Sequence, residues 1–286
     1  MDDPARVEAR LDNIRAVEPI LSALRTVSQG SMQAARKRLR AVERYSEELL
    51  ALRGWLPGGA EPAIDVSPDA PVLILALGSD RGLCGRFNHE VADRVQALHT
   101  TRDMEGVQGR VWSLGLRLTA RLEGLGLPPD QQERFARRAL PAFERADRLA
   151  ASLQKKIDDG SLRAVYLVHN QPHRAGLARS VDLRWLPLQL ARGAAGEERW
   201  PPPIIETDPQ DLLRRIRAQA AAIQLYAAML ASSAAEHAAR YHLLEDAAQN
   251  TERLLADLQV AVQQARQQAI TAEMQELAAG AGLMKT

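Results

Sequence analysis

The stretch of residues 206–216, "ETDPQDLLRRI", begins the segment that decides the fold. Asp208 is of a residue type that caps helix N-termini, Pro209 suits the first helical position, and Asp211 stands where the helix dipole favours acids. From there to about Ala279 the sequence contains neither proline nor glycine. A helix of about 70 residues is roughly 100 Å long. It is too long to be buried inside one small domain, so we expect it to pair with another long element.

The predicted partner is the N-terminal segment, from about Pro4 to Trp55, where Asp3 and Pro4 repeat the same start signal. Small or apolar residues recur there every seven positions, at Val7, Ile14, Leu21, Ser28, Ala35, Val42 and Leu49. The C-terminal segment carries a similar narrow stripe. Such stripes are typical of coiled coils, and the long region between the two segments permits an antiparallel pair. Pro19 lies within the first stripe, where we expect it to kink the helix.

The middle of the chain alternates between strand-like and helix-like segments. Residues 70–77, "APVLILAL", have the pattern of a buried strand, and residues 88–100, "NHEVADRVQALHT", that of a helix. Continued alternation predicts a small, mostly parallel α/β sheet. We therefore expect three parts: a coiled-coil helix in 1–57, an α/β domain in 70–205 and a second coiled-coil helix in 208–286.

A glycine-rich turn follows the first predicted strand, in residues 78–91, "GSDRGLCGRFNHEV". A P-loop needs a lysine and a hydroxyl residue directly after its second glycine. Here Gly78 and Gly82 have the wrong spacing, and Arg86 is followed by Phe87. The three-glycine pattern of dinucleotide-binding proteins is also absent. We interpret the stretch as a tight structural turn, with nucleotide binding as the weaker alternative at this point.

Composition limits the other functional classes. The formal net charge of +1 argues against a general binder of nucleic acid or anionic membranes. No run reaches the roughly 18 apolar residues of a membrane span, and the acidic N-terminus predicts no signal peptide. Cys84 is the one cysteine, which we interpret as a buried apolar thiol rather than a nucleophile. His169 and His173 are separated by a strand end and Pro172, so we expect no metal site.

Several motifs together resemble the γ subunit of F-type ATP synthase over essentially the whole chain. The family pattern "DRGLCGG" followed closely by Asn corresponds to the residues Asp80, Arg81, Gly82, Leu83, Cys84, Gly85 and, shortly after, Asn88. The C-terminal stretches "AEHAARYHLLEDAAQNT" and "ARQQAITAEMQELAAGAGLM" are similar to the family's last helix. The chain departs from the family at Arg86, at Glu245 and Asp246, and in "EPILSAL", which contains Pro19 and is three residues shorter than the family's stretch. Three residues are less than one helical turn, so the deletion would rotate the apolar stripe unless the kink absorbs it.

The resemblance implies a mixed fold: a long antiparallel two-helix coiled coil of the N- and C-terminal helices, plus a small Rossmann-like α/β domain. It implies a rotor stalk with no catalytic residue, cofactor or metal of its own, in a complex that uses Mg-ATP and ADP at its β subunits. Arg266 and Gln267 match family residues that contact a β-subunit loop. The helix end in the apolar sleeve of the hexamer would comprise Ile270, Met274, Leu277, Leu283 and Met284.

The implied partners are the α and β subunits as an α3β3 hexamer, the ε subunit and the membrane c-ring. The implied location is peripheral, on the cytoplasmic face of a bacterial inner membrane. The alternatives are a sodium-translocating or alternate-type F-ATPase, a coiled-coil adaptor, and an independent nucleotide-binding enzyme built on the middle domain. The adaptor leaves the joint presence of "DRGLCG" and "ARQQAIT" unexplained, and the enzyme lacks the phosphate-binding patterns.

Overall fold

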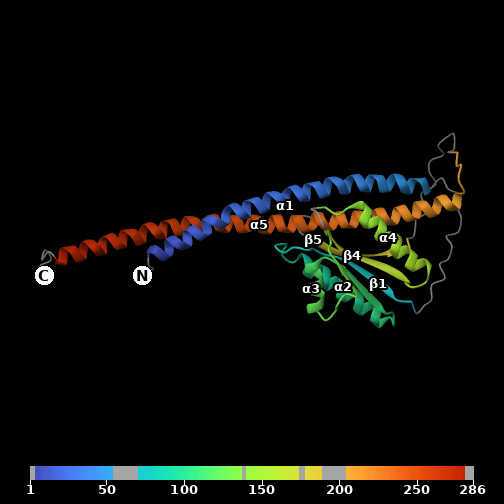
Figure 1. Cartoon of the computed structure of the whole chain (residues 1–286), viewed down its shortest axis with the longest axis horizontal. Coiled ribbons are helices and arrows are strands. Elements are labelled where there is room, and N and C mark those ends of the chain that lie inside the picture. The colour runs from blue at the N-terminus through green and yellow to red at the C-terminus, as the bar shows by residue number, and fades with distance from the viewer. Residues whose placement is uncertain (1–3, 54–69, 137–139, 174–177, 189–203, 281–286) are drawn as a thin grey trace. The chain divides into compact units, whose positions relative to one another are not determined.

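A computed structural model describes residues 4–53, 70–136, 140–173, 178–188 and 204–280. Figure 1 labels the main elements. In chain order they are α1 (Pro4–Arg53), β1 (Val72–Leu77), α2 (Phe87–Met104), β2 (Gly109–Leu114), α3 (Leu116–Gly124), β3 (Gln131–Glu133), α4 (Phe143–Asp158), β4 (Ala164–Pro172), β5 (Ala178–Leu186) and α5 (Pro209–Gly280). The chain forms two compact units, one of residues 1–27 and 241–286 and the other of residues 28–240. Both α1 and α5 contribute residues to each unit.

The unit of residues 28–240 contains a five-stranded sheet in the order β3-β2-β1-β4-β5. β1 pairs in parallel with both β2 and β4, and β2 pairs in parallel with β3. The edge strand β5 is antiparallel to β4. The predicted mostly parallel α/β sheet is therefore confirmed, and all six residues of β1 are buried because helices cover both of its faces.

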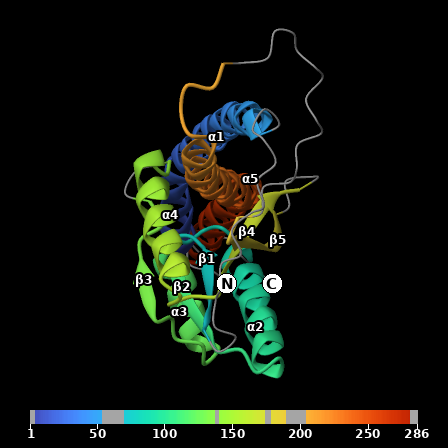
Figure 2. The same cartoon turned by 90° about the vertical axis from the view of Figure 1, so that its right-hand side faces the viewer.

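Alternate residues of the strands build two separate apolar layers, as the period of two requires. Leu73, Leu75 and Leu77 face a core shared with α4, α5 and the part of α1 in this unit. Ile74 and Ala76 face a second core, formed with α2 and α3. Figure 2 shows the helices around the sheet. The sheet thus attaches directly to the long helix α5 through one of its two faces.

The part of α5 between Ala220 and Arg240 is buried at nearly every position. This differs from the narrow stripe expected along the whole helix. The segment is rich in Ala and Ser, and small side chains let α1 approach on one side and the sheet on another. The Trp185 indole N–H also donates to the carbonyl oxygen of Ala221 at 3.2 Å, which ties β5 to this stretch.

The unit of residues 1–27 and 241–286 is an antiparallel helix pair. Leu11 of α1 packs with Leu258 and Val262 of α5 in its apolar centre. Arg25 contacts Glu245, while Glu8 contacts Arg266, so residue numbers rise along one helix as they fall along the other. The predicted antiparallel pair is confirmed. α1 is helical across Pro19, and the kink expected there remains a prediction.

Candidate functional site

The glycine turn connects the end of β1 to the start of α2 and has a constrained backbone. Leu83 and Gly85 both lie in the left-handed region, with φ of 59° and 57°. The backbone N–H of Phe87, the first residue of α2, donates to the Cys84 carbonyl at 3.2 Å. The chain therefore reverses direction within a few residues before the helix begins.

Backbone donors that a phosphate would need at the head of this turn are already used. The Gly78 N–H donates to the Leu114 carbonyl at 2.7 Å, and the Ser79 N–H donates to Asn88 Oδ1 at 2.9 Å. Asn88 Nδ2 donates in return to Ser79 Oγ at 2.8 Å. A phosphate-binding loop directs free N–H groups at its ligand. This arrangement closes the turn on itself and argues against the nucleotide-binding alternative.

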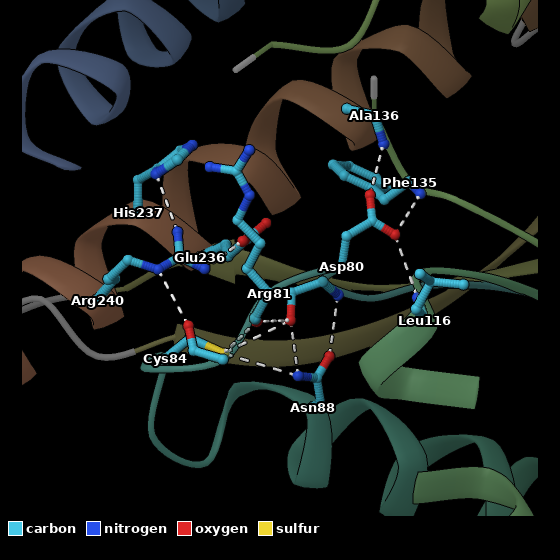
Figure 3. Close-up of polar contacts among 12 residues, drawn as sticks. Asp80, Arg81, Cys84, Asn88, Leu116, Phe135, Ala136, Glu236, His237 and Arg240 are labelled. Carbon is cyan, nitrogen blue, oxygen red and sulfur yellow. Dashed lines mark hydrogen bonds and ion pairs between the residues drawn. The ribbon is translucent and has the colours of Figure 1, made fainter. Parts of the chain in front are cut away.

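Asp80 fixes the turn to two other segments. Its carboxylate accepts hydrogen bonds from the backbone N–H groups of Leu116 at 3.2 Å, Phe135 at 3.0 Å and Ala136 at 3.1 Å. Leu116 is the first residue of α3, whose N-cap, Gly115, provides no side-chain cap. An acid at a helix N-terminus satisfies an unpaired donor and the helix dipole. Figure 3 shows the three contacts converging on the one carboxylate.

Cys84 is buried inside the turn and is poorly suited to nucleophilic chemistry. Its Sγ lies 3.6 Å from Ser79 Oγ and 3.7 Å from Asn88 Nδ2, and the side chain packs against Phe87 and Ala235. Burial raises the pKa of the Cys84 thiol. Because the thiolate is the reactive form, this thiol serves as a small apolar group between the turn and α5.

Arg240 of α5 joins the helix to the turn. Its Nε donates to the Gly82 carbonyl at 3.2 Å, and its Nη2 donates to Glu236 Oε1 at 2.6 Å. The two side chains are only 9% and 10% exposed. Burial raises the pKa of Glu236, and the attraction of Arg240 opposes that shift. Nη1 of Arg240 also lies 3.2 Å from His237 Nδ1 (Figure 3).

Sequence reasoning missed Glu236 and Arg240 as members of this site. The two residues lie one turn apart on α5, in the stretch "AEHAARYHLLEDAAQNT", and the resemblance of that stretch to the family's last helix gives neither residue a role. The detectable signal was a charged pair at spacing i, i+4 inside a run of alanines. Charged side chains within such a buried run need partners.

Glu245, one of the departures from the family pattern, has a partner within its own unit. Arg25 Nη1 lies 3.0 Å from Glu245 Oε2, and both side chains are about one-third exposed. The acid is therefore matched by an arginine on the facing helix. Asp246 is exposed.

A charge-swap series is expected to measure this pair. Arg25→Glu places two acids together and should lower the free energy of unfolding by about 1 kcal/mol, a modest value because solvent screens the pair. Arg25→Glu combined with Glu245→Arg should restore most of the loss. Urea titration of the full chain measures both variants. A double variant no more stable than Arg25→Glu would show that the pair contributes nothing.

Arg266 and Gln267, the predicted partner contacts, lie in the same helix pair. Arg266 donates through Nε and Nη2 to Glu8 Oε1, at 2.8 and 2.6 Å, yet the arginine side chain remains 65% exposed. Gln267 is exposed, as are the predicted tip residues Ile270, Met274 and Leu277. Leu283 and Met284 lie outside the described residues. The end of α5 thus presents apolar and polar side chains together.

The two histidines considered for metal binding are in different environments. His169 is buried within β4, whereas His173 follows the strand and is exposed. Among the described residues no cluster of three or more His, Cys, Asp or Glu could hold a metal ion. Burial lowers the pKa of His169 from its ordinary 6.5 to about 4. His169 is therefore a neutral core residue at physiological pH.

The buried imidazole should make stability depend on pH. A base whose folded-state pKa is lowered takes up protons preferentially in the unfolded chain, so stability is full above pH 6.5 and falls as pH drops toward 4. The shift corresponds to a loss of about 3 kcal/mol. His169→Gln should flatten this slope, and His173→Gln should not. Urea titrations between these pH values test it, and identical slopes for all three proteins would refute the assignment.

Comparison with known proteins agrees with this geometry. The sequence model of the family described as ATP synthase matches residues 4–283. The chain belongs to the ATP synthase family. It is 28% identical to the ATP synthase gamma chain of Acidithiobacillus ferrooxidans, over 98% of this chain and 99% of the relative. It is 27% identical to the gamma chain of Rubrobacter xylanophilus, over 96% of each.

The fold of this member of the ATP synthase family is also found in larger assemblies. A chain of the Euglena gracilis mitochondrial ATP synthase, from a structure of OSCP, F1 and c-ring, matches with a TM-score of 0.66 at 17% identity, covering 98% of this chain and 94% of that one. A chain from the Tetrahymena thermophila central stalk and c-ring matches with a TM-score of 0.57 at 20% identity, over 80% and 99%. The γ-subunit resemblance is confirmed, and a family match over nearly the full length disfavours an unrelated adaptor.

Proposed function

We propose that this chain is the central rotor stalk, the γ subunit, of an F1Fo ATP synthase. The observation that supports it most is the antiparallel pairing of α1 and α5, with Leu11, Leu258 and Val262 between the helices and exposed apolar residues at the end of α5. Two paired helices are stiffer than one and can carry rotation along their length. The gamma-chain relatives match this sequence over nearly their whole length, including the segments that form both helices.

The stalk works by making equivalent sites different. A hexamer with three identical β sites becomes asymmetric when an uneven shaft fills its centre, because each site meets a different face of the shaft. A contact that favours one conformation of a β subunit changes its nucleotide affinity by the same free energy. As the shaft turns, each β subunit passes through every state in succession.

Ion flow through the c-ring would drive this rotation during synthesis, and ATP hydrolysis would reverse it. We assign Mg-ATP and ADP binding and the chemical step to the β subunits, and no cofactor to this chain. The α/β unit would contact the ε subunit and the c-ring, and the end of α5 the α3β3 hexamer. No helix in the described part of the chain is long and apolar enough to cross a membrane. Because the proposed partners include the membrane c-ring, we place the chain peripherally, on the cytoplasmic side of a bacterial inner membrane.

Reconstitution tests this proposal. The chain is co-expressed with the α and β subunits of the same genome, and the product is separated by size exclusion and assayed for hydrolysis of Mg-ATP. We expect a stable hexamer with one copy of this chain, more active than α and β alone. A hexamer equally active without the chain, from which the chain elutes separately, would contradict the proposal.

A further inference from the structure

We infer that Arg240, positioned by Glu236, is the coupling residue that locks α5 to the glycine turn, so that rotation of the α/β sheet is passed to the shaft. This inference rests on the proposed rotor function. Arg240 contacts no nucleotide and is a positioning residue. Its role would be mechanical, and its effect would be largest when the complex works against a load.

The Arg240 guanidinium is held in one orientation by residues of α5. Arg240 holds three partners with one planar guanidinium: the Gly82 carbonyl through Nε, Glu236 through Nη2 and His237 through Nη1. Because the guanidinium is planar and its donors point in fixed directions, three hydrogen bonds hold its orientation. A lysine ammonium is a single group on a flexible stem and cannot hold an orientation in this way. Glu236 and His237 belong to α5 itself, so the guanidinium is fixed to the helix before it reaches the turn.

The contact is also rigid on the sheet side. Gly82 follows Asp80 by two residues, and Asp80 is bound to the start of α3 and to the segment after β3 through three backbone N–H groups. Asn88 closes the same turn from α2 through Ser79. Arg240 therefore donates to the Gly82 carbonyl, which belongs to a turn that is hydrogen-bonded to several elements of the sheet domain (Figure 3).

The position of Arg240 along α5 suits this role. Trp185 ties the sheet to Ala221 of the same helix, and Arg240 lies roughly 28 Å further along at 1.5 Å per residue. Apolar packing between these points is non-directional and permits sliding, whereas two separated hydrogen bonds resist it. Arg240 is also the last residue of the compact unit formed by residues 28–240.

The reactivity of Cys84 can report on the contact between Arg240 and the glycine turn. Cys84 is its only cysteine, is 3% exposed and packs against Ala235 of α5. In the assembled complex, Arg240→Ala should speed the reaction of Cys84 with a thiol reagent about tenfold. The thiol reacts only when the structure around it opens locally, and the open fraction rises tenfold for about every 1.4 kcal/mol removed from the opening free energy. The control is Arg214→Ala, which removes an exposed α5 arginine that pairs only locally with Asp211. It should leave the rate unchanged.

The functional test compares ATP synthesis in membranes, during which the rotor works against a load, with ATP hydrolysis by the detached complex, during which it does not. In membranes, Arg240→Ala, Arg240→Lys and Glu236→Gln should each lower ATP synthesis about tenfold, the factor given by about 1.4 kcal/mol. ATP hydrolysis by the α3β3 hexamer with this chain, detached from the membrane, should fall much less. In that complex the α/β sheet transmits no torque to the membrane ring. Arg214→Ala should match the unsubstituted complex in both assays.

The two proposals fail in different ways. If the Arg240 and Glu236 variants assemble and synthesise ATP like Arg214→Ala, the coupling role is refuted, even if Cys84 reacts faster. An equal loss of synthesis and unloaded hydrolysis in Arg240→Lys would also refute it, since that result describes damage to the hexamer contact. If the unsubstituted chain does not assemble with α and β, the proposed function itself fails.

Discussion

The double substitution Arg266→Ala and Gln267→Ala is expected to lower ATP synthesis by the assembled complex at least tenfold. The two side chains lie next to each other on α5 and remain exposed. We propose that they donate hydrogen bonds to a loop of the β subunit. A charge-assisted bond of this kind contributes about 1.5–3 kcal/mol, enough to hold a β subunit in one state and still break at each step.

Glu8→Ala is the matched control for this prediction. It removes the acid that Arg266 contacts within the chain but leaves the arginine itself. An exposed pair of this kind contributes less than about 1 kcal/mol to stability, so Glu8→Ala should leave synthesis near its normal rate. Normal synthesis in the double variant, or equal losses in both proteins, would contradict the assignment of Arg266 as a partner contact.

Gly115→Ala is expected to lower the free energy of unfolding by about 3 kcal/mol or more. Gly115 has φ of 131°, where an L side chain is strained. A Cβ there would lie 2.7 Å from the carbonyl carbon of Gly78 and 2.9 Å from the Ser79 nitrogen. Both are backbone atoms at the head of the glycine turn and cannot move without breaking its hydrogen bonds. The free-energy cost of the strained backbone and the cost of the steric overlap therefore add.

Gly124→Ala provides the control for this substitution. Gly124 is the last residue of α3, and a Cβ there meets no atom within 4 Å. Alanine favours helix over glycine, so this variant should be unchanged or slightly more stable. Denaturant titration of both full-length proteins compares them. A Gly115→Ala protein as stable as Gly124→Ala would show that the close approach at the turn is not required.

The long helices and the sheet could be predicted because local patterns determine them. Pro4 and Pro209 begin α1 and α5 as expected, and the apolar run of β1 is a buried central strand. β3 was not predicted, because its three residues are polar and exposed at the sheet edge. Its pairing with β2 depends on position in the fold rather than on an apolar pattern.

The contact between α5 and the glycine turn, made by Arg240 and Gly82, could be predicted only in part. "DRGLCG" indicated a structural turn, but no spacing rule connects Gly82 with Arg240, which is 158 residues away. The buried environment of Glu236 likewise arises from tertiary packing of alanine-rich α5 against the turn. Glu245 was noticed as a departure from the family, and its partner Arg25, 220 residues away, became apparent only from the helix pairing.

Direct observation of rotation tests the central claim. A probe is attached to Met104→Cys, an 84% exposed position at the end of α2, while buried Cys84, whose thiol pKa is raised, reacts slowly. The complex of this chain with the α3β3 hexamer is fixed to a surface and supplied with Mg-ATP. We predict rotation in a single direction, in steps with one dwell for each β subunit. ATP hydrolysis by the fixed complexes while the probe stays still, or only wanders at random, would contradict the rotor account.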